Sequence, residues 1–316
     1  MSTCGTSFCA AGQPWSLYGS TIYNPGLTPY LSGINNPSGT IVLVNQARLN
    51  TIRITNFLDR EGDPSTAPYD PTRWAKVDAM IAAASAAGLH VILAISDYRS
   101  MLWNNCIDPY TTDWTNFITF VANRVNTVTH VAYKNDPTIA FVSIAGEPLV
   151  VGPHTFTAKV TGTSCTITYT TQQLTDFYRA TTTVWQQQQG SVLVNTGGLT
   201  YLDLSHSGID WQAIFALPTV AFCDIKTYGG MLAWAPNAVT YCQSLGKPIV
   251  DEEFGFRQSL GDRNRSNWFR STYSALRSMH FAGVAFWNLG YELAGTSYEV
   301  NPTTELTFAA VQSNAP

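Results

Sequence analysis

The stretch Ile139-Ala-Phe-Val-Ser-Ile-Ala-Gly-Glu-Pro148 places one acidic residue directly after a short apolar run. β-Branched and aromatic side chains are common in this run, as is typical of a strand that is buried on both faces. Similar runs recur along the chain at 15–19, 51–54, 90–95, 191–195, 219–225, 248–251 and 284–287. Together with 139–145 they predict eight strands, and the acidic residue falls at the end of the fourth.

Segments with helical spacing separate these strands. The clearest are 71–88, 113–133, 171–189, 237–245 and 263–281. The alternation indicates parallel βαβ units, and eight of them predict an α/β fold of the closed (β/α)₈ TIM-barrel type. A doubly wound open sheet also alternates, but it is the weaker alternative because no G-x-G-x-x-G follows the first strand.

The length of 316 residues suits one such barrel with its loops. We expect residues 1–316 to form a single domain, because no linker of low complexity interrupts the pattern. The Thr-rich segment 151–171 is longer than an ordinary strand-to-helix connection, so we expect a loop or small hairpin over the barrel mouth.

Composition excludes several classes of partner. Charged residues make up only 12% of the chain, about half the usual share, and the net charge is −4. This balance offers no basic field for nucleic acid or anionic lipid. No apolar run approaches the roughly 18 residues of a membrane span, so we expect no membrane partner.

Six cysteines permit three disulfides, and none of them has the two-residue spacing of a zinc or redox motif. The expected pairs are Cys4 with Cys9, Cys106 with Cys165, and Cys223 with Cys242. Cys4 and Cys9 would close a small loop, whereas each of the other pairs joins segments that the barrel brings together. This pairing is one of fifteen possible connectivities.

Cysteine usage also bears on compartment. The even count, and a polar composition with only five lysines, suit an exported protein in an oxidising medium. The alternative is a cytosolic protein with six buried thiols. Residues 1–5 contain neither a charged region nor an apolar one, so we expect any secretory signal to be absent from this chain.

Two of the seven glutamates follow predicted strands. Glu147 ends the fourth strand, and Glu253 ends the seventh. Catalytic groups gather at the carboxyl ends of barrel strands, and strands four and seven lie across the barrel from each other. Two carboxylates placed in this way can flank one sugar ring, as glycoside hydrolysis requires. The alternative is a pair of solvated strand-end glutamates.

These segments resemble motifs of the clan A retaining glycoside hydrolases, above all family 5. Tyr133 to Pro148 is similar to the fourth strand of that family, whose Glu is the acid/base, here Glu147. Gly246 to Gly255 resembles the strand-seven motif, which implies that Glu253 is the nucleophile and Glu252 a neighbour.

Further motifs follow in the family's order, from about Phe8 to Asn288. Leu49 to Ile54 resembles the strand-two motif, which implies an active-site arginine at Arg53. Val284 to Trp287 resembles the strand-eight motif, whose Trp forms the floor of the subsite for the sugar to be cleaved. Phe8 to Tyr23 resembles the opening strand.

Three positions depart from the family pattern. Gly146 stands where the family has an Asn that binds the sugar 2-hydroxyl, and Ser96 stands near the place of the strand-three His. Lys226 replaces the His of the strand-six His-x-Tyr motif, whereas Tyr228 is kept. The departures weaken a substrate assignment more than a mechanism.

The residue types suggest a role for each position. Arg53 and Lys226 would keep Glu253 ionised, and Tyr228 could donate a hydrogen bond to it. Glu147 would need apolar surroundings to act as an acid near neutral pH. The alternatives are a structural ion pair for Arg53 and a core position for Trp287.

Aromatic side chains in predicted loops could stack on sugars. They are Trp103, Tyr110, Trp234 and Tyr291. Packing within the protein is the alternative for each. The five histidines are scattered without ligand spacing, so we expect no metal and no cofactor.

The resemblance implies an enzyme that hydrolyses β-glycosidic bonds of a plant or microbial oligo- or polysaccharide with retention, and we expect it to be exported and monomeric. Within family 5, the lead-in at 135–139 is most similar to the endo-β-1,4-mannanases. A β-1,4-glucanase or an exo-β-glycosidase with an unusual sugar at the cleavage subsite is the enzymatic alternative. A non-catalytic carbohydrate-binding barrel is the alternative from another class.

Overall fold

Eight parallel strands form the centre of the computed structural model, which describes residues 1–22, 34–55, 70–159, 161–291 and 297–315. The strands are β4 (Leu17–Ile22), β5 (Thr51–Ile54), β6 (His90–Ala94), β7 (Ile139–Ser143), β10 (Leu193–Asn195), β11 (Cys223–Lys226), β12 (Ile249–Phe254) and β13 (Gly283–Phe286). Their order in the sheet is β10-β7-β6-β5-β4-β13-β12-β11. A parallel bridge between Leu199 and Ile225 joins the chain after β10 to β11. The predicted (β/α)₈ barrel is confirmed, with all eight strands near their predicted positions.

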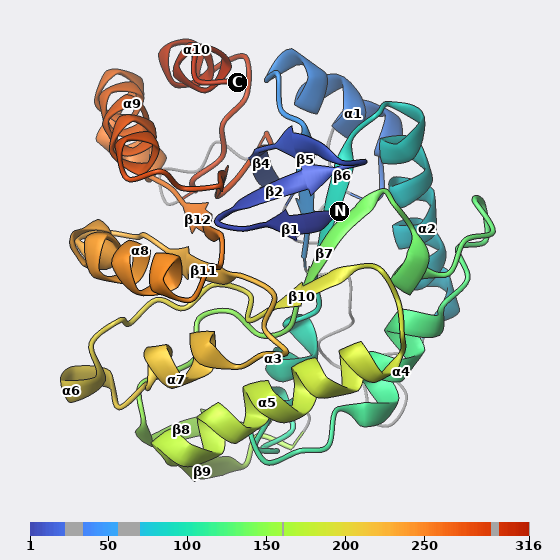
Figure 1. Ribbon diagram of the computed structural model, residues 1–316, viewed down its shortest axis with the longest axis vertical. Coiled ribbons are helices and arrows are strands. Elements are labelled where there is room, and N and C mark those ends of the chain that lie inside the picture. The colour runs from blue at the N-terminus through green and yellow to red at the C-terminus, as the bar shows by residue number, and fades with distance from the viewer. Residues whose placement is uncertain (23–33, 56–69, 160, 292–296, 316) are drawn as a thin grey trace.

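Helices surround the strands (Figure 1). They are α1 (Pro37–Gln46), α2 (Pro71–Ala86), α3 (Asp97–Asn104), α4 (Thr115–Asn123), α5 (Thr171–Gln187), α6 (Leu204–Ser207), α7 (Trp211–Ala216), α8 (Ala235–Ser244), α9 (Asp262–Ser278) and α10 (Glu305–Gln312). Short 3₁₀ helices span Tyr133–Asn135, Met231–Trp234 and Gln258–Leu260. Helix α5 starts at a capping box, in which Thr170 accepts from the backbone of Gln173 and the Gln173 side chain accepts from that of Thr170.

The helix expected over 113–133 is wrong in its second half, because α4 ends at Asn123. The buried carboxylate of Asp78 accepts hydrogen bonds from Arg124, from both the backbone and the side chain of Thr127, and from Tyr133. The Asn126 side chain also accepts from backbone N–H groups two and three residues ahead. These side-chain bonds compete with helical ones and fold the segment into a turn.

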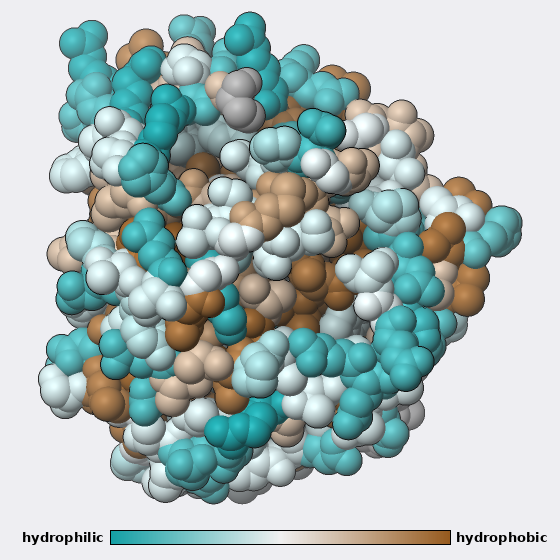
Figure 2. All heavy atoms as spheres, viewed as in Figure 1, coloured by the Kyte–Doolittle hydropathy of each residue, from teal (hydrophilic) through white to brown (hydrophobic). Residues whose placement is uncertain are grey.

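A small antiparallel sheet covers the amino-terminal end of the barrel. Its strands are β1 (Ser2–Cys4), β2 (Ser7–Ala10) and β3 (Gln13–Trp15). Phe8 is fully buried there, and its ring contacts those of Phe141 and Phe222. The expected strand 15–19 therefore begins later, at Leu17, since Trp15 belongs to the small sheet. In Figure 2, hydrophobic residues gather toward the centre of this face and hydrophilic ones cover most of its rim.

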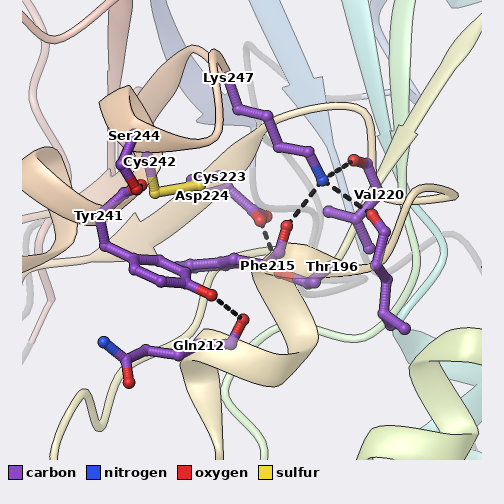
Figure 3. The surroundings of a disulfide bond; sticks show 11 residues. Thr196, Gln212, Phe215, Val220, Cys223, Asp224, Tyr241, Cys242, Ser244 and Lys247 are labelled. Atoms are coloured by element: carbon purple, nitrogen blue, oxygen red, sulfur yellow. Dashed lines mark hydrogen bonds between the residues drawn. A yellow bond between two sulfur atoms is a disulfide. The ribbon is translucent and has the colours of Figure 1, made fainter.

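The expected hairpin within 151–171 is present, formed by β8 (Gly152–Thr157) and β9 (Ser164–Tyr169). The three disulfides have the predicted pairing: Cys4–Cys9, Cys106–Cys165 and Cys223–Cys242. The second ties the hairpin to the chain after α3. The third joins β11 to α8, next to a Lys247 side chain whose Nζ donates to three carbonyl groups (Figure 3).

Candidate active site

A bulge in β12 brings two consecutive glutamates into the barrel. Ile225 pairs with Asp251 and the next residue, Lys226, pairs with Glu253, so Glu252 is an extra residue in the strand. Both glutamates are buried, with Glu252 fully so. Bulges of this kind re-aim side chains and are common beside active sites.

Glu253 is held by two cations and a phenol. Its Oε2 atom lies 2.6 Å from Nζ of Lys226 and 3.0 Å from Nη1 of Arg53. The hydroxyl of Tyr228 donates to Oε1 at 2.7 Å. Burial acts to raise the pKa of Glu253, but the charges of Lys226 and Arg53, with the hydrogen bonds, hold it below the usual value. The carboxylate is therefore ionised and fixed in orientation.

Glu252 instead forms hydrogen bonds with side chains inside the barrel. Its Oε1 accepts from Nε of Arg53 at 2.9 Å and from the hydroxyl of Ser143, and its Oε2 accepts from the Asn195 amide at 3.2 Å. Its side chain is fully buried, whereas that of Glu253 is 6% exposed. Of the two glutamates, Glu253 is therefore the one that a substrate could reach.

A further carboxyl group, Asp224, lies beside Glu252. Burial, and then the charge of Glu252, raise the pKa of Asp224 well above its usual value. Asp224 also accepts from the backbone N–H groups of Gly197 and Gly198, the first at 2.6 Å. This carboxyl group therefore anchors the turn after β10 that lies next to Glu147. The sequence offered no spacing signal for this contact, because it joins residues of different strands.

Glu147 follows β7 at the same end of the barrel. Its side chain is 44% exposed, and its Oε2 lies 3.8 Å from Nζ of Lys226. One ammonium group thus contacts both Glu147 and Glu253, so their Oε2 atoms can be no farther apart than the two contact distances combined. Short separations of about 5 to 5.5 Å are typical of retaining glycoside hydrolases.

The position before Glu147 has no room for a larger side chain. A Cβ atom on Gly146 would lie 1.9 Å from the carbonyl oxygen of Gly197 and 3.1 Å from Cε of Lys226. A Cβ atom on Gly198 would lie 2.5 Å from Cγ of Lys226. The backbone of Gly197 and the side chain of Lys226 therefore occupy the space that an Asn at position 146 would need.

The predicted aromatic positions differ in their surroundings. Trp103, Trp234 and Trp287 are half-buried, and Tyr110 is buried against Tyr169 and Phe177. The ring of Trp103 is in contact with Arg99 and Phe156, and that of Trp234 lies 6.5 Å from Tyr201. These contacts show that packing within the protein uses Tyr110 and much of Trp103.

Ser96 lies between β6 and α3, directly before the helix, and is half-buried. Arg99, which the sequence did not single out, lies in the same region and contacts the backbone at Glu147. Its guanidinium donates to the carbonyl oxygens of Gly146 and Glu147. An arginine just after the third strand was the one available signal, but nothing local links it to the fourth strand.

Among the described residues, no group of His, Cys, Asp and Glu is arranged to hold a metal ion. In the same part of the chain, no helix has the length and apolar character needed to cross a membrane.

A (β/α)₈ barrel with paired carboxylates at the carboxyl ends of its strands is typical of glycoside hydrolases. Residues 10–139 match the family model described as Cellulase (glycosyl hydrolase family 5). This match covers fewer than half of the residues, and over them the chain is similar to the glycoside hydrolases of family 5. The match ends before both Glu147 and Glu253. A comparison with curated proteins found no match.

Solved structures share the fold at low sequence identity. The endo-1,4-β-mannanase from Rhizomucor miehei has a TM-score of 0.78 at 20% identity, with 99% of each chain covered. The endo-β-1,4-mannanase from Thermotoga petrophila has a TM-score of 0.75 at 17% identity, covering 96% of this chain and 77% of that one. The catalytic domain of the major endoglucanase from Xanthomonas campestris has a TM-score of 0.63 at 15% identity, covering 100% and 99%.

Proposed function

We propose that residues 1–316 form one catalytic domain that hydrolyses β-1,4-mannosidic bonds with retention, using Glu253 as nucleophile and Glu147 as acid/base. The observation that carries this proposal is the environment of Glu253. Arg53 and Lys226 both contact its Oε2, and Tyr228 holds its Oε1. A nucleophilic carboxylate must be ionised and aimed at one carbon atom, and these three contacts favour both conditions.

In the first step, Glu253 attacks the anomeric carbon and forms an ester with it. The bond from that carbon to the leaving oxygen breaks, and Glu147 donates a proton to this oxygen. In the second step, Glu147 takes a proton from a water molecule. The water oxygen bonds to the anomeric carbon, and Glu253 leaves as a carboxylate.

The neighbouring residues have supporting roles in this proposal. Trp287, directly after β13 and half-buried, would form the floor of the cleavage subsite. Trp234 would stack on another sugar unit of the polysaccharide, beyond the cleavage subsite. Gly146 and Ser96 would lie near the bound sugar, at positions where the family has larger polar side chains. Trp103 would contribute from α3, mainly through its support of Arg99.

The preference for mannan rests on the lead-in at 135–139 and on two similar structures that are described as endo-β-1,4-mannanases. A β-1,4-glucanase or an exo-acting β-glycosidase is the enzymatic alternative, and an endoglucanase is among the similar structures. Three disulfides and the low lysine count support an exported protein. We propose that it acts as a monomer on a plant or microbial polysaccharide.

The test is reducing-sugar release from purified mannan, glucan, xylan, chitosan and a uronic-acid polymer. We expect the fastest release from mannan, and a first product with the β configuration. Faster release from glucan would establish the enzymatic alternative. If a folded protein that binds mannan released sugar from no polymer, the non-catalytic barrel would be correct.

A further inference from the structure

The guanidinium of Arg99 lies against the backbone that carries Glu147. Arg99 is in the first turn of α3, and the residue is only 8% exposed. Its Nη1 donates to the carbonyl oxygen of Gly146 and, at 3.1 Å, to that of Glu147. A buried cation thus donates hydrogen bonds to two successive carbonyl groups, those of the residue proposed as the acid/base and of the residue before it.

The backbone of Glu147 needs such support. Its φ of 53° lies in the left-handed region, which is unfavourable for residues with a Cβ atom. This conformation turns the peptide groups on either side, so that both carbonyl oxygens face Arg99. Hydrogen bonds from a charged donor are stronger than those from a neutral one. Arg99 therefore stabilises the conformation that directs the Glu147 side chain.

Other parts of the same loop are fixed as well. Tyr178 donates to the carbonyl oxygen of Ala145 at 2.6 Å, and the backbone N–H of Glu147 donates to Gly198 at 2.9 Å. Tyr169 donates to the carbonyl oxygens at positions 149 and 150. The Glu147 side chain, by contrast, is 44% exposed. Backbone contacts therefore determine where its carboxyl group lies.

Arg99 is itself supported from the hairpin. Its guanidinium carbon lies 4.8 Å from the ring centre of Trp103, and Phe156 of β8 stacks on that ring at 5.2 Å. The Cys106–Cys165 disulfide ties the hairpin to the end of this region. The stacked rings leave the guanidinium little freedom to turn away from the loop.

We propose that Arg99 is a positioning residue for proton transfer by Glu147. It holds the loop in the left-handed turn that aims the carboxyl group at the leaving oxygen. The proposal rests on the acid/base role proposed for Glu147. Under a merely structural role, Arg99 would fill a buried position and its loss would impair every substrate alike.

The two roles differ in their dependence on the leaving group. An oligosaccharide leaving group needs a proton, whereas dinitrophenolate leaves without one. The ratio kcat/KM reports only the steps up to formation of the glycosyl-enzyme. Loss of acid positioning therefore lowers kcat/KM for an oligosaccharide and spares kcat/KM for a dinitrophenyl glycoside. The second step still needs a base, so kcat for the dinitrophenyl substrate falls and a burst of dinitrophenolate appears.

The experiment compares kcat/KM for mannotetraose and 2,4-dinitrophenyl β-mannobioside, or the glucose counterparts if glucan is the better polymer. Arg99→Met should lose about 100-fold on the oligosaccharide and less than about threefold on the dinitrophenyl substrate. Arg99→Lys retains a donor and a charge, so its loss should be smaller with the same selectivity. If Arg99→Met does not fold, Trp103→Leu provides the same comparison of the two substrates, because it removes the ring that packs against the Arg99 guanidinium.

Arg124 offers a matched control. It is also an arginine near an indole ring, 5.7 Å from that of Trp74, and it pairs with Asp78 at 2.6 Å on the outside of the barrel. Arg124→Lys should lower the melting temperature and leave the ratio between the two substrates unchanged.

Glu147→Ala separates the two proposals. If Glu147→Ala shows the leaving-group selectivity and the Arg99 variants lose both activities equally, the positioning role of Arg99 is wrong. If Glu147→Ala itself lacks the selectivity, the proposed acid/base role is wrong, and the positioning role is overturned with it.

Discussion

The ammonium group of Lys226 lies 2.6 Å from Oε2 of Glu253, in a site where both side chains are only 6% exposed. The same nitrogen lies 3.8 Å from Glu147. A single cation thus lies between the two carboxylates that we propose as nucleophile and acid/base. This arrangement accounts for the glycines around it, since the Lys226 side chain fills the space next to Gly146 and Gly198.

Removal of this cation should shift the pH dependence of activity. The charge of Lys226 helps to hold the pKa of Glu253 below its usual value, so the pKa rises in Lys226→Met. The acidic limb of the kcat/KM profile should therefore move to higher pH, with a loss of about tenfold or more at mildly acidic pH, since a charged hydrogen bond contributes about 1.5 to 3 kcal/mol. Kinetics between pH 4 and 8 provide the measurement.

The same variant distinguishes an ion pair from substrate recognition. We expect equal impairment on neutral and uronic-acid polymers, because Lys226 is already paired with Glu253. A selective loss on the acidic polymer would instead mean that the cation contacts the substrate, and an unchanged acidic limb would contradict the ion-pair role.

Restoration of the family residue at position 146 should fail. A Cβ atom in Gly146→Asn would lie 1.9 Å from the Gly197 carbonyl oxygen, so the backbone must shift. We expect a loss of about 1 to 3 kcal/mol of stability together with most of the turnover on mannan. Thermal melting and reducing-sugar release would measure these losses.

Gly230→Ala is the matched control for this substitution, since a Cβ atom there meets no atom within 4 Å. This variant should behave like the native protein. If Gly146→Asn raised turnover on mannan or glucan, the site would have room for the family contact and the packing account would be wrong.

Asp251 should make stability depend on pH. Burial raises the pKa of Asp251 to about 7 although Thr227 and the backbone of Glu253 donate to it. The folded state then binds a proton that the unfolded state loses near pH 4, so this group lowers stability as pH rises from about 4 to 7.

Asp251→Asn removes that contribution. As pH rises through this window, the variant should become more stable relative to the native protein, with its free energy of unfolding larger by up to about 1.4 kcal/mol per pH unit. Denaturant melts at pH 5, 6 and 7 would show the difference. Parallel pH profiles for the two proteins would contradict the raised pKa.

Local patterns in the sequence were enough to predict the barrel. Apolar runs identified the strands, and the position of Glu147 and Glu253 after two of these runs was enough to bring them to one end of the barrel. The disulfide pairing followed from the same placement. Each of these features depends either on the periodicity within one segment or on the order of the segments along the chain, and both can be read from the sequence.

Features that depend on contacts between distant segments were not predicted. Arg99 reaches Glu147 across 48 positions, and Asp224 reaches Gly197 across 27. The turn after Asn123 forms because Asp78 of another helix attracts Arg124 and its neighbours. The burial of Glu252 likewise depends on a bulge in β12, and no residue type at that position predicts a bulge.

Covalent labelling of Glu253 is the direct test of its role as the nucleophile. An activated 2-deoxy-2-fluoro-β-mannoside should trap the ester. Fluorine at C2 slows both steps, whereas the good leaving group speeds only the first, so the ester forms faster than it is hydrolysed. Mass spectrometry of the native protein and of Glu252→Gln should find one sugar attached to the peptide that contains Glu253, with fragmentation placing it on Glu253. Glu253→Gln should carry no label. A label on Glu252, or a first product of the α configuration with no label at all, would contradict that role.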